Sequence, residues 1–436
     1  MLNTSATSNV TSEQATTLTS SDNSVKATIS AGAVDAEETT SLTLTVTPTT
    51  STAENATAIT TTEGTEYYEI TLKNQDNAVV ESFENNGYAD VELYIGESLT
   101  DLIVYHKSTA LTTTANDAGE YYSYNANNGV LTLHVTSFSP FSIGFNNAVA
   151  KIGDNYYATL AKAVKAAENN DSVVMLTDVK LPTTITVNKN ITLDLNGKKI
   201  SNSFTTTGAN TDSRIFNIKS SLTINGIGSI ETSGRYAIMV YANGKLVVNN
   251  GEISALAYTI YNQGTASVTG GSITASGNYS ETVTYAGLTQ AIVVGGTNAF
   301  YNAGTATISG GKISVEKNDA VINASGNMTI SDGEIKAGLG AAITNTKGSL
   351  TVTGGTIQAV ENVIASSGSG AVTVEGGTFY GDPVSWIAMN GFAVPTIKGG
   401  SFNSSPNSDA VAVGYTVQES TVDGTTWYTV VSNPNN

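Results

Sequence analysis

Cysteine is absent from this chain of 436 residues, and histidine, tryptophan and arginine occur only twice each. Without cysteine there is no disulfide framework, no thiol nucleophile and no thiolate metal site. His106 and His134 both precede the repeats described below, so those repeats hold no histidine-based metal site and no serine–histidine–acid triad. No apolar run approaches the roughly 20 residues that a membrane-spanning helix needs.

Basic residues are also scarce, with 19 Lys and Arg against 37 Asp and Glu and a formal net charge of −18. A surface of that sign repels nucleic acid and anionic lipid, and no basic stripe offsets it. The residues after Met1 do not resemble a signal peptide, and those before Asn436 do not resemble an anchor. We therefore expect a segment of a longer secreted chain, with no nucleic-acid partner and no membrane insertion.

A short phrase recurs seven times in the second half of the chain: two apolar residues one position apart, a bend with glycine, and then Ile or Phe. In every copy the Ile or Phe comes five residues after the second apolar residue, as in Val352 and Ile357. The seven glycines are Gly251, Gly271, Gly311, Gly333, Gly355, Gly377 and Gly400. They recur at intervals of 20, 40, 22, 22, 22 and 23 residues, and such a fixed period indicates a solenoid.

One period contains three short strands and three bends. Residues 350–353 alternate apolar and polar side chains, Gly354 and Gly355 permit the positive φ of a sharp bend, and residues 356–359 alternate again. Residues 342–345 give a third strand one period earlier. No helical stripe and no dense leucine pattern is present. The prediction is an all-β chain whose main part is a right-handed parallel β-helix, a solenoid with about 22 residues per coil.

A column of asparagines supports the stacking of coils. Asn262, Asn302, Asn323 and Asn345 each follow a short apolar strand, at spacings of about one or two coils. Amides stacked in this way hydrogen-bond along the axis, as in cross-β ladders. The functional alternative for the same column is a polar binding row.

The remaining sequence divides around the solenoid. Residues 1–24 are dominated by Thr, Ser and Asn, which predicts a disordered linker. Residues 25–146 contain six alternating strands without the period, which predicts one β-sandwich domain. Residues 151–410 are predicted to form the β-helix with an N-terminal capping helix near 159–167, and residues 411–436 a C-terminal cap and linker.

Three segments resemble a known group of proteins. Residues 158–164 and 191–198 resemble the opening of pectin-lyase-like β-helix domains in large bacterial cell-surface proteins, and the Gly-Gly-x-Ile/Phe coils are similar to the bodies of those domains. Residues 136–141 resemble the closing motif of a β-sandwich often found in the same proteins. The resemblance implies a secreted, adhesin-like bacterial surface protein, and it carries little information about activity because β-helices serve many functions.

Acidic residues of the solenoid are scattered, whereas glycoside hydrolysis needs paired carboxylates at a fixed separation. They are Glu252, Glu316, Asp319, Asp332, Glu334, Glu361, Glu375 and Asp382. We interpret them as solvated surface charges, with a weak calcium site as the alternative. We predict no catalytic residue, no other metal site and no cofactor.

Binding residues are easier to nominate than catalytic ones. Arg214 and Arg235 lie 21 residues apart, about one coil, which makes them a candidate anion-binding pair, with two unrelated loop residues as the alternative. Residues 278–287 interrupt the period between Gly271 and Gly311 and predict an insertion, where Tyr279 and Tyr285 could stack on sugar rings or be buried in an irregular coil. Trp386 is a second ligand-binding candidate, with packing at the end of the stack as its alternative.

These observations favour a non-catalytic extracellular role in adhesion or structural display. The expected partner is a neutral glycan or a protein of a host or neighbouring cell, because cleaving an acidic polysaccharide needs charge neutralisation and a positioned base. One alternative is a carbohydrate-active enzyme, a polysaccharide lyase or glycoside hydrolase, built on the same β-helix. Another is a phage or surface spike, which would expose an apolar stripe along one face.

Overall fold

The computed structural model describes residues 2–10, 14–35, 39–50, 59–202, 214–276, 280–285, 288–293, 298–386 and 393–433. For residues 280–285, 288–293, 361 and 383–386 it describes the backbone alone. The chain divides into two compact units, Met1–Ala166 and Ala167–Asn436. Nearly all of the described structure is β.

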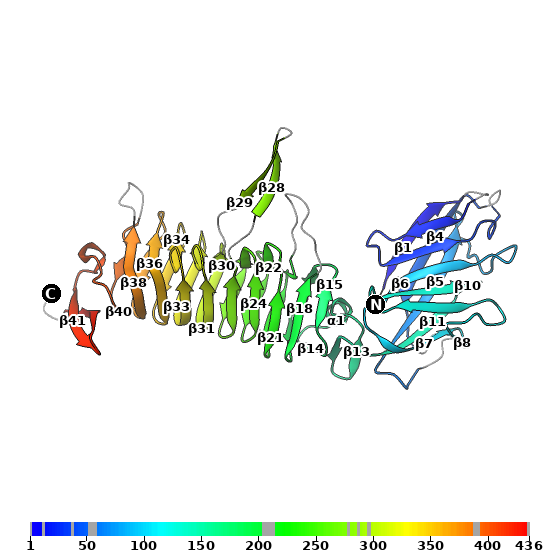
Figure 1. Cartoon of the computed structure of the whole chain (residues 1–436), viewed down its shortest axis with the longest axis horizontal. Helices are drawn as coiled ribbons and strands as arrows, with labels where there is room; N and C mark the ends of the chain where they lie inside the picture. Colours follow the sequence, from blue (N-terminus) through cyan, green and yellow to red (C-terminus); the bar gives the residue numbers. More distant parts are fainter. Residues whose placement is uncertain are drawn as a thin grey trace. The chain divides into compact units, whose positions relative to one another are not determined.

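The first unit contains two antiparallel sheets (Figure 1). One sheet has the order β1 (Thr4–Asn9), β4 (Ser41–Pro48), β5 (Gly64–Asn74), β11 (Pro140–Asn146), β7 (Thr100–His106) and β8 (Thr109–Leu111). The other has the order β2 (Thr16–Thr19), β3 (Val25–Ile29), β6 (Ala89–Tyr94), β10 (Val130–Val135) and β9 (Tyr121–Asn125). Alternate residues of the strands are buried, as in Leu42, Leu44 and Val46 of β4, which gives each sheet one core face.

Strands β1 and β2 correct the expectation of a disordered linker over residues 1–24. β1 pairs with β4, with Thr4 opposite Val46, and β2 pairs with β3, with Leu18 opposite Ala27. Leu18 is fully buried. A polar composition is compatible with these strands because only alternate side chains face the core. The partner of β1 lies more than thirty residues further along the chain, so the composition of residues 1–24 alone does not reveal this pairing.

A hairpin and the predicted helix complete the first unit. The hairpin consists of β12 (Ala150–Ile152) and β13 (Asn155–Tyr157), and helix α1 (Leu160–Ala166) follows. Lys162 on α1 donates from Nζ to Oε2 of Glu66 on β5 at 2.7 Å and to the carbonyl of Ile95 at 3.1 Å. Both side chains of this ion pair are buried. By their contacts α1 and the hairpin group with the first unit, Met1–Ala166, so the division of the chain into compact units falls after α1.

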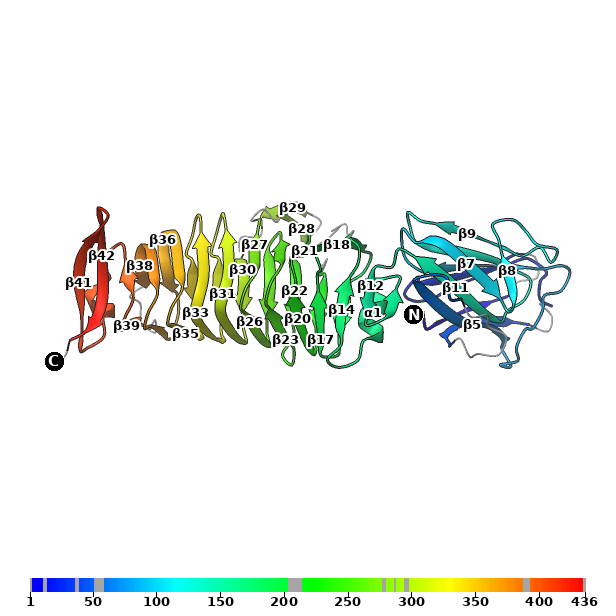
Figure 2. The same cartoon turned by 90° about the horizontal axis from the view of Figure 1, so that it is seen from below.

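The second unit is a right-handed β-solenoid of about nine turns with successive coils about 22 residues apart, as predicted (Figure 2). Its strands stack in three parallel rows. Row 1 contains β14 (Ser172–Met175), β17 (Ile191–Asp194), β20 (Ser221–Asn225), β23 (Lys245–Val248), β26 (Thr265–Val268), the first halves of β31 (Thr305–Val315) and β33 (Asn327–Ala337), β35 (Ser349–Val352), β37 (Val372–Val374) and β39 (Thr396–Ile397).

Rows 2 and 3 follow row 1 in each coil. Row 2 contains β15 (Val179–Leu181), β18 (Lys198–Asn202), β21 (Gly228–Glu231), β24 (Glu252–Ala255), β27 (Ser272–Ala275), the second halves of β31 and β33, the first halves of β36 (Thr356–Ser366) and β38 (Thr378–Trp386), and β40 (Ser401–Phe402). Row 3 contains β16 (Ile185–Val187), β19 (Phe216–Ile218), β22 (Tyr236–Val240), β25 (Tyr258–Asn262), β30 (Asn298–Asn302), β32 (Val321–Asn323), β34 (Ile343–Asn345) and the second halves of β36 and β38.

The repeated apolar residues fill the interior of the coils. Ile335 pairs in register with Ile313 of the preceding coil and with Ile357 of the next, and all three are buried. Gly355 has φ of +88°, as the predicted bend requires.

The predicted asparagine column is an internal ladder. Nδ2 of Asn262 donates to Oδ1 of Asn302 at 2.7 Å, Asn302 donates to Asn323 at 2.8 Å, and Asn323 donates to Asn345 at 2.7 Å. All four side chains are fully buried. The column is therefore structural and does not form a binding row.

Two hairpins lie outside the three rows. β28 (Ser280–Tyr285) and β29 (Leu288–Val293) pair antiparallel and project from the solenoid at the predicted insertion (Figure 1). The predicted C-terminal hairpin consists of β41 (Tyr415–Val422) and β42 (Thr425–Ser432), preceded by the 3-10 turn η1 (Ser408–Ala410). β42 pairs antiparallel with β40 and so covers the last coil.

Candidate functional site

Row 3 carries a group of half-exposed aromatic and basic side chains on its outer surface. Side chains alternate along a strand, so Tyr261 and Tyr301 face outward while their neighbours Ile260 and Phe300 are buried. We call the group the tyrosine–arginine cluster; its members are Arg214, Arg235, Tyr236, Tyr258, Tyr261 and Tyr301. They come from β22, β25 and β30 and from the bends before β19 and β22.

Parallel register brings the four tyrosines together as two stacked pairs. Tyr236 lies opposite Tyr258, with ring centroids 5.5 Å apart, and Tyr261 lies opposite Tyr301, with ring centroids 4.6 Å apart. The pairs meet edge to face, since Tyr258 is inclined at 82° to Tyr261 and at 87° to Tyr301. Contacts of this kind contribute about 0.5–1.5 kcal/mol each beyond the buried area, so the rings hold one another in place.

Both arginines of the chain lie over the same ring. The guanidinium carbon of Arg214 is 5.4 Å from the centroid of Tyr236, and that of Arg235 is 5.2 Å from it. Arg235 is also 5.5 Å from the centroid of Tyr258. A guanidinium over a tyrosine face is attracted by the ring quadrupole, by about 0.5–1 kcal/mol at exposed sites. The one-coil spacing of the two arginines thus brings them to a single aromatic support.

The polar contacts of the two arginines differ. A terminal nitrogen of Arg214 donates to Oδ1 of Asn217 at 3.1 Å and to the hydroxyl of Tyr241 at 2.9 Å. Arg235 forms no ion pair within the described residues, and its buried Nε has no hydrogen-bond partner there. Lys219, whose Nζ is 5.8 Å from the ring centroid of Tyr241, adds a third positive charge nearby.

One tyrosine of the cluster, Tyr301, has a raised pKa. Burial raises the pKa of Tyr301, and the neighbouring Tyr261, which shares a hydrogen bond with it, and Tyr258 raise that pKa further. Tyr301 therefore stays protonated well into the alkaline range. The cluster offers aromatic rings, hydroxyl groups and guanidinium groups on one surface.

The three aromatic residues that the sequence suggested for sugar binding are Tyr279, Tyr285 and Trp386. Tyr279 lies outside the described residues. Tyr285 is the last residue of β28, and Trp386 is the last residue of β38, where it pairs in register with Ser366. For these two residues the backbone alone is described, so their predicted role in ligand binding stays a prediction.

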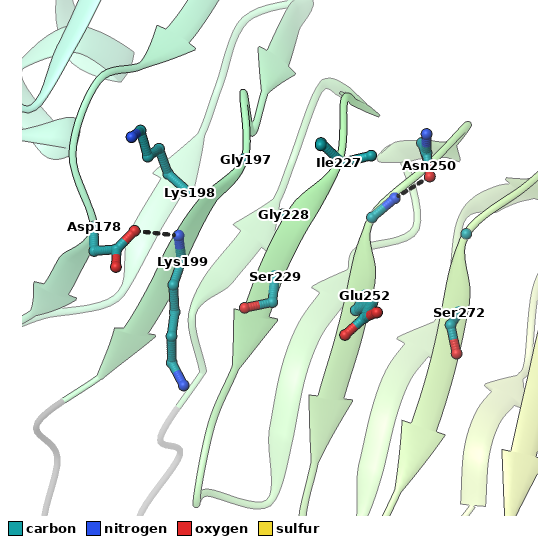
Figure 3. Close-up of a pocket in the computed structure, with 12 residues that line it drawn as sticks. Asp178, Gly197, Lys198, Lys199, Ile227, Gly228, Ser229, Asn250, Glu252 and Ser272 are labelled. Carbon is teal, nitrogen blue, oxygen red and sulfur yellow. Dashed lines mark hydrogen bonds between the residues drawn. The ribbon is translucent and has the colours of Figure 1, made fainter.

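Row 2 has a shallow groove of about 460 Å³ on its outer face (Figure 3). Lys199, Ser229, Glu252 and Ser272 project into it from four successive coils. Lys199 pairs with Glu231 of the next coil, and its backbone nitrogen donates to Oδ1 of Asp178 at 2.9 Å. The groove lacks aromatic side chains among its lining residues, so it offers a ligand less than the tyrosine–arginine cluster.

Two acidic residues, Glu334 on row 2 and Glu375 in the bend between rows 1 and 2, are paired with lysines of adjacent coils. Glu334 lies 3.0 Å from Lys312, and Glu375 lies 3.7 Å from Lys398. Asp332 accepts a hydrogen bond from the backbone nitrogen of Gly333 at 2.8 Å. Among the described residues no group of three or more His, Cys, Asp or Glu side chains is arranged to hold a metal ion.

Sequence reasoning identified the two arginines and missed the four tyrosines. A usable signal was present, because Tyr236 and Tyr258 are 22 residues apart and Tyr261 and Tyr301 are 40 apart, the same interval that separates Gly271 from Gly311. The interval of 40 spans the inserted hairpin, so a search for a strict 22-residue spacing does not find it.

Comparison of the chain with models of protein families, with curated proteins and with solved structures gives no match. In the part of the chain that the structure describes, no helix has the length and hydrophobicity needed to cross a membrane.

Proposed function

We propose that the chain is a non-catalytic module of a bacterial cell-surface protein, which acts outside the cell in adhesion or structural display. The tyrosine–arginine cluster is the observation that carries the proposal. It gathers four aromatic rings and two guanidinium groups on the outer face of the solenoid, where a partner can reach them. Aromatic side chains with polar tips and stacked arginines are the groups that dominate binding surfaces.

The proposed relationship to pectin-lyase-like β-helix domains of adhesin-like proteins rests on the sequence motifs at residues 136–141, 158–164 and 191–198. The solenoid architecture agrees with it. A stack of coils is a rigid support, because each coil pairs its backbone with its neighbours along the whole axis. Such a support suits a protein that presents a binding face away from a cell.

An enzymatic role finds less support in the side chains. Glu334 and Glu375 pair with lysines, and Asp332 accepts a hydrogen bond from the backbone of its own bend. Polysaccharide cleavage needs a base and an acid placed on either side of one bond.

A spike also finds less support, because it would need an exposed apolar stripe along one face. Among the exposed hydrophobic residues of the described coils, Ile227 precedes its row 2 strand, whereas Leu339 and Val360 follow theirs. These side chains therefore do not lie in one line along the axis.

The proposal predicts binding without turnover. When the whole chain is applied to an array of neutral and acidic glycans, it should bind at least one class of glycan. When the chain is incubated with pectin or alginate, it should release no cleavage products, with or without calcium.

The double variant Tyr261→Ala, Tyr301→Ala should bind the array roughly tenfold more weakly, since about 1–2 kcal/mol of aromatic contact is removed. Product release that disappears in Asp332→Asn or Glu334→Gln would instead establish an enzyme.

A further inference from the structure

The two arginines of the chain share one tyrosine, although only 19 of its 436 residues are Lys or Arg. Each guanidinium group lies over the ring of Tyr236, and Arg235 also lies over Tyr258. A guanidinium group is attracted to the face of an aromatic ring through its charge, and this attraction does not use up its N–H donors. The contact with Tyr236 therefore leaves the donors of Arg235 available to a ligand.

Arg235 is the arginine whose terminal guanidinium nitrogens are available to a ligand. Within the described residues it forms no ion pair, and its terminal nitrogens form no hydrogen bond and are not among the buried atoms. A ligand that reaches them from solvent can accept hydrogen bonds from them. Arg214 is held by Asn217 and Tyr241, so it adds positive charge from a fixed position beside Tyr236.

The ligand that these groups fit carries a carboxylate on a sugar ring. A planar carboxylate can accept two parallel hydrogen bonds from one guanidinium group. The hydroxyls and apolar edges of Tyr258, Tyr261 and Tyr301 lie beside it and suit the hydroxyl and C–H groups of a sugar. Phosphate would satisfy Arg235 equally well but would make no use of the adjacent aromatic surface.

The negative charge of the whole chain does not prevent this. Charges further apart than about 8 Å are largely screened at physiological ionic strength. Glu231 and Glu334 on row 2, and Glu375 in the bend that precedes it, are paired with lysines. The cluster itself contains two guanidinium groups, with Lys219 beside Tyr241, so its own formal charge is positive. A long polyanion would still meet repulsion from the rest of the surface.

We propose that the tyrosine–arginine cluster binds a glycan residue bearing a carboxylate, which Arg235 holds as a bidentate ion pair while the tyrosines contact the sugar. This inference rests on the proposed binding function. It assigns an acidic glycan as the ligand, in place of the neutral glycan or protein that the overall charge led us to expect. That expectation followed from the acidic charge of the whole chain, whereas the fold places both arginines at one site, as their candidate pairing requires.

The test uses the whole chain on an array of matched pairs, in which each uronic-acid or sialic-acid glycan is accompanied by its methyl ester. The ester keeps the shape and removes the charge. We expect the acids to be retained at least tenfold more strongly than the esters, and Arg235→Gln to abolish this difference. Arg235→Lys keeps the charge but lacks the planar fork, so it should lose most of the preference. Lys312→Gln, which removes one positive charge on row 2, should leave it unchanged.

The outcomes separate this inference from the proposed function. Equal retention of acids and esters, or a preference for acids that survives Arg235→Gln, overturns the carboxylate site and leaves the binding module intact. Failure to retain any glycan on the array overturns both. A melting temperature of Arg235→Lys within about 2 °C of the unsubstituted chain ensures that a lost preference reports on the site and not on unfolding.

Discussion

Single residues at the bends determine how closely the coils can stack. After row 3 the chain turns at a column of glycines, among them Gly326, Gly348 and Gly370, beside the asparagine ladder. Nδ2 of Asn345 donates to the carbonyl of Gly348 at 3.0 Å, so the amide both supports its neighbour in the ladder and satisfies the bend. A Cβ atom added to Gly348 would overlap the carbonyl oxygen of Gly326 in the preceding coil. Glycine is therefore required here by the distance between backbones.

Gly348→Ala should lower the free energy of unfolding of the solenoid by about 1–3 kcal/mol, because two backbones must move apart to admit the methyl group. Chemical denaturation followed by circular dichroism measures the loss. Gly197→Ala is the matched control, since Gly197 has φ of +75° but no atom within 4 Å of an added Cβ. It should cost only the backbone strain, about 1 kcal/mol. A smaller loss for Gly348→Ala than for Gly197→Ala would show that the coils are not held by this contact.

Strands and rows are stabilised by like residues stacked in register. β33 places Ile335 between Ile313 and Ile357 in the interior, whereas the next residue, Lys336, is exposed. A substitution at an interior position therefore affects the preceding and following coils as well as its own. Each coil of a solenoid packs only against its neighbours, so distant coils cannot compensate for the change.

Ile335→Asp should destabilise the solenoid by several kcal/mol, because a carboxylate would be buried without a partner. We expect a lower melting temperature and new protease cleavage within residues 305–366. Lys336→Asp introduces the same side chain one position away on the outer face and should leave the melting temperature within about 2 °C. Similar melting temperatures for the two variants would contradict the assigned register.

The whole molecule consists of two compact units, and helix α1 belongs to the first. Its Lys162 pairs with Glu66, which also accepts a hydrogen bond from the hydroxyl of Tyr68, and all three side chains are buried. Burial and the adjacent Glu66 raise the pKa of Tyr68 well above its usual value, so that hydroxyl remains a donor. Removing one member of a buried ion pair typically costs about 3–5 kcal/mol, because the remaining charge is left without compensation.

A polypeptide of residues 1–166 should consequently fold with a higher melting temperature than one of residues 1–147, which ends at the boundary that the sequence suggested. Differential scanning calorimetry of the two fragments measures the difference. Lys162→Met in the longer fragment should reproduce most of the loss. Lys26→Met, which breaks the exposed pair with Glu92, should cost at most about 1 kcal/mol. Equal melting temperatures for the two fragments would assign α1 to the solenoid after all.

The sequence alone determined the solenoid, its period, its bend glycines and its asparagine ladder. Each of these depends on a residue and its counterpart about one coil away, and a regular interval along the chain becomes a contact in space through parallel pairing. It also predicted six strands of the first unit from their alternation. The prediction of a neutral ligand followed from the net charge of the chain. Net charge carries no information about where individual charged side chains lie on the surface.

Other features depend on contacts between residues that do not recur at a regular interval along the chain. Only the tertiary structure decided these features. β1 is a strand because a distant segment, β4, offers it an edge, and β2 pairs with β3 of the same sheet. α1 joins the first unit because Glu66 lies buried where Lys162 can reach it. The cluster around Tyr236 exists because strand register places two bends and three strands of row 3 side by side. A linear sequence records which side chains are available, and the stacking of coils determines which of them meet.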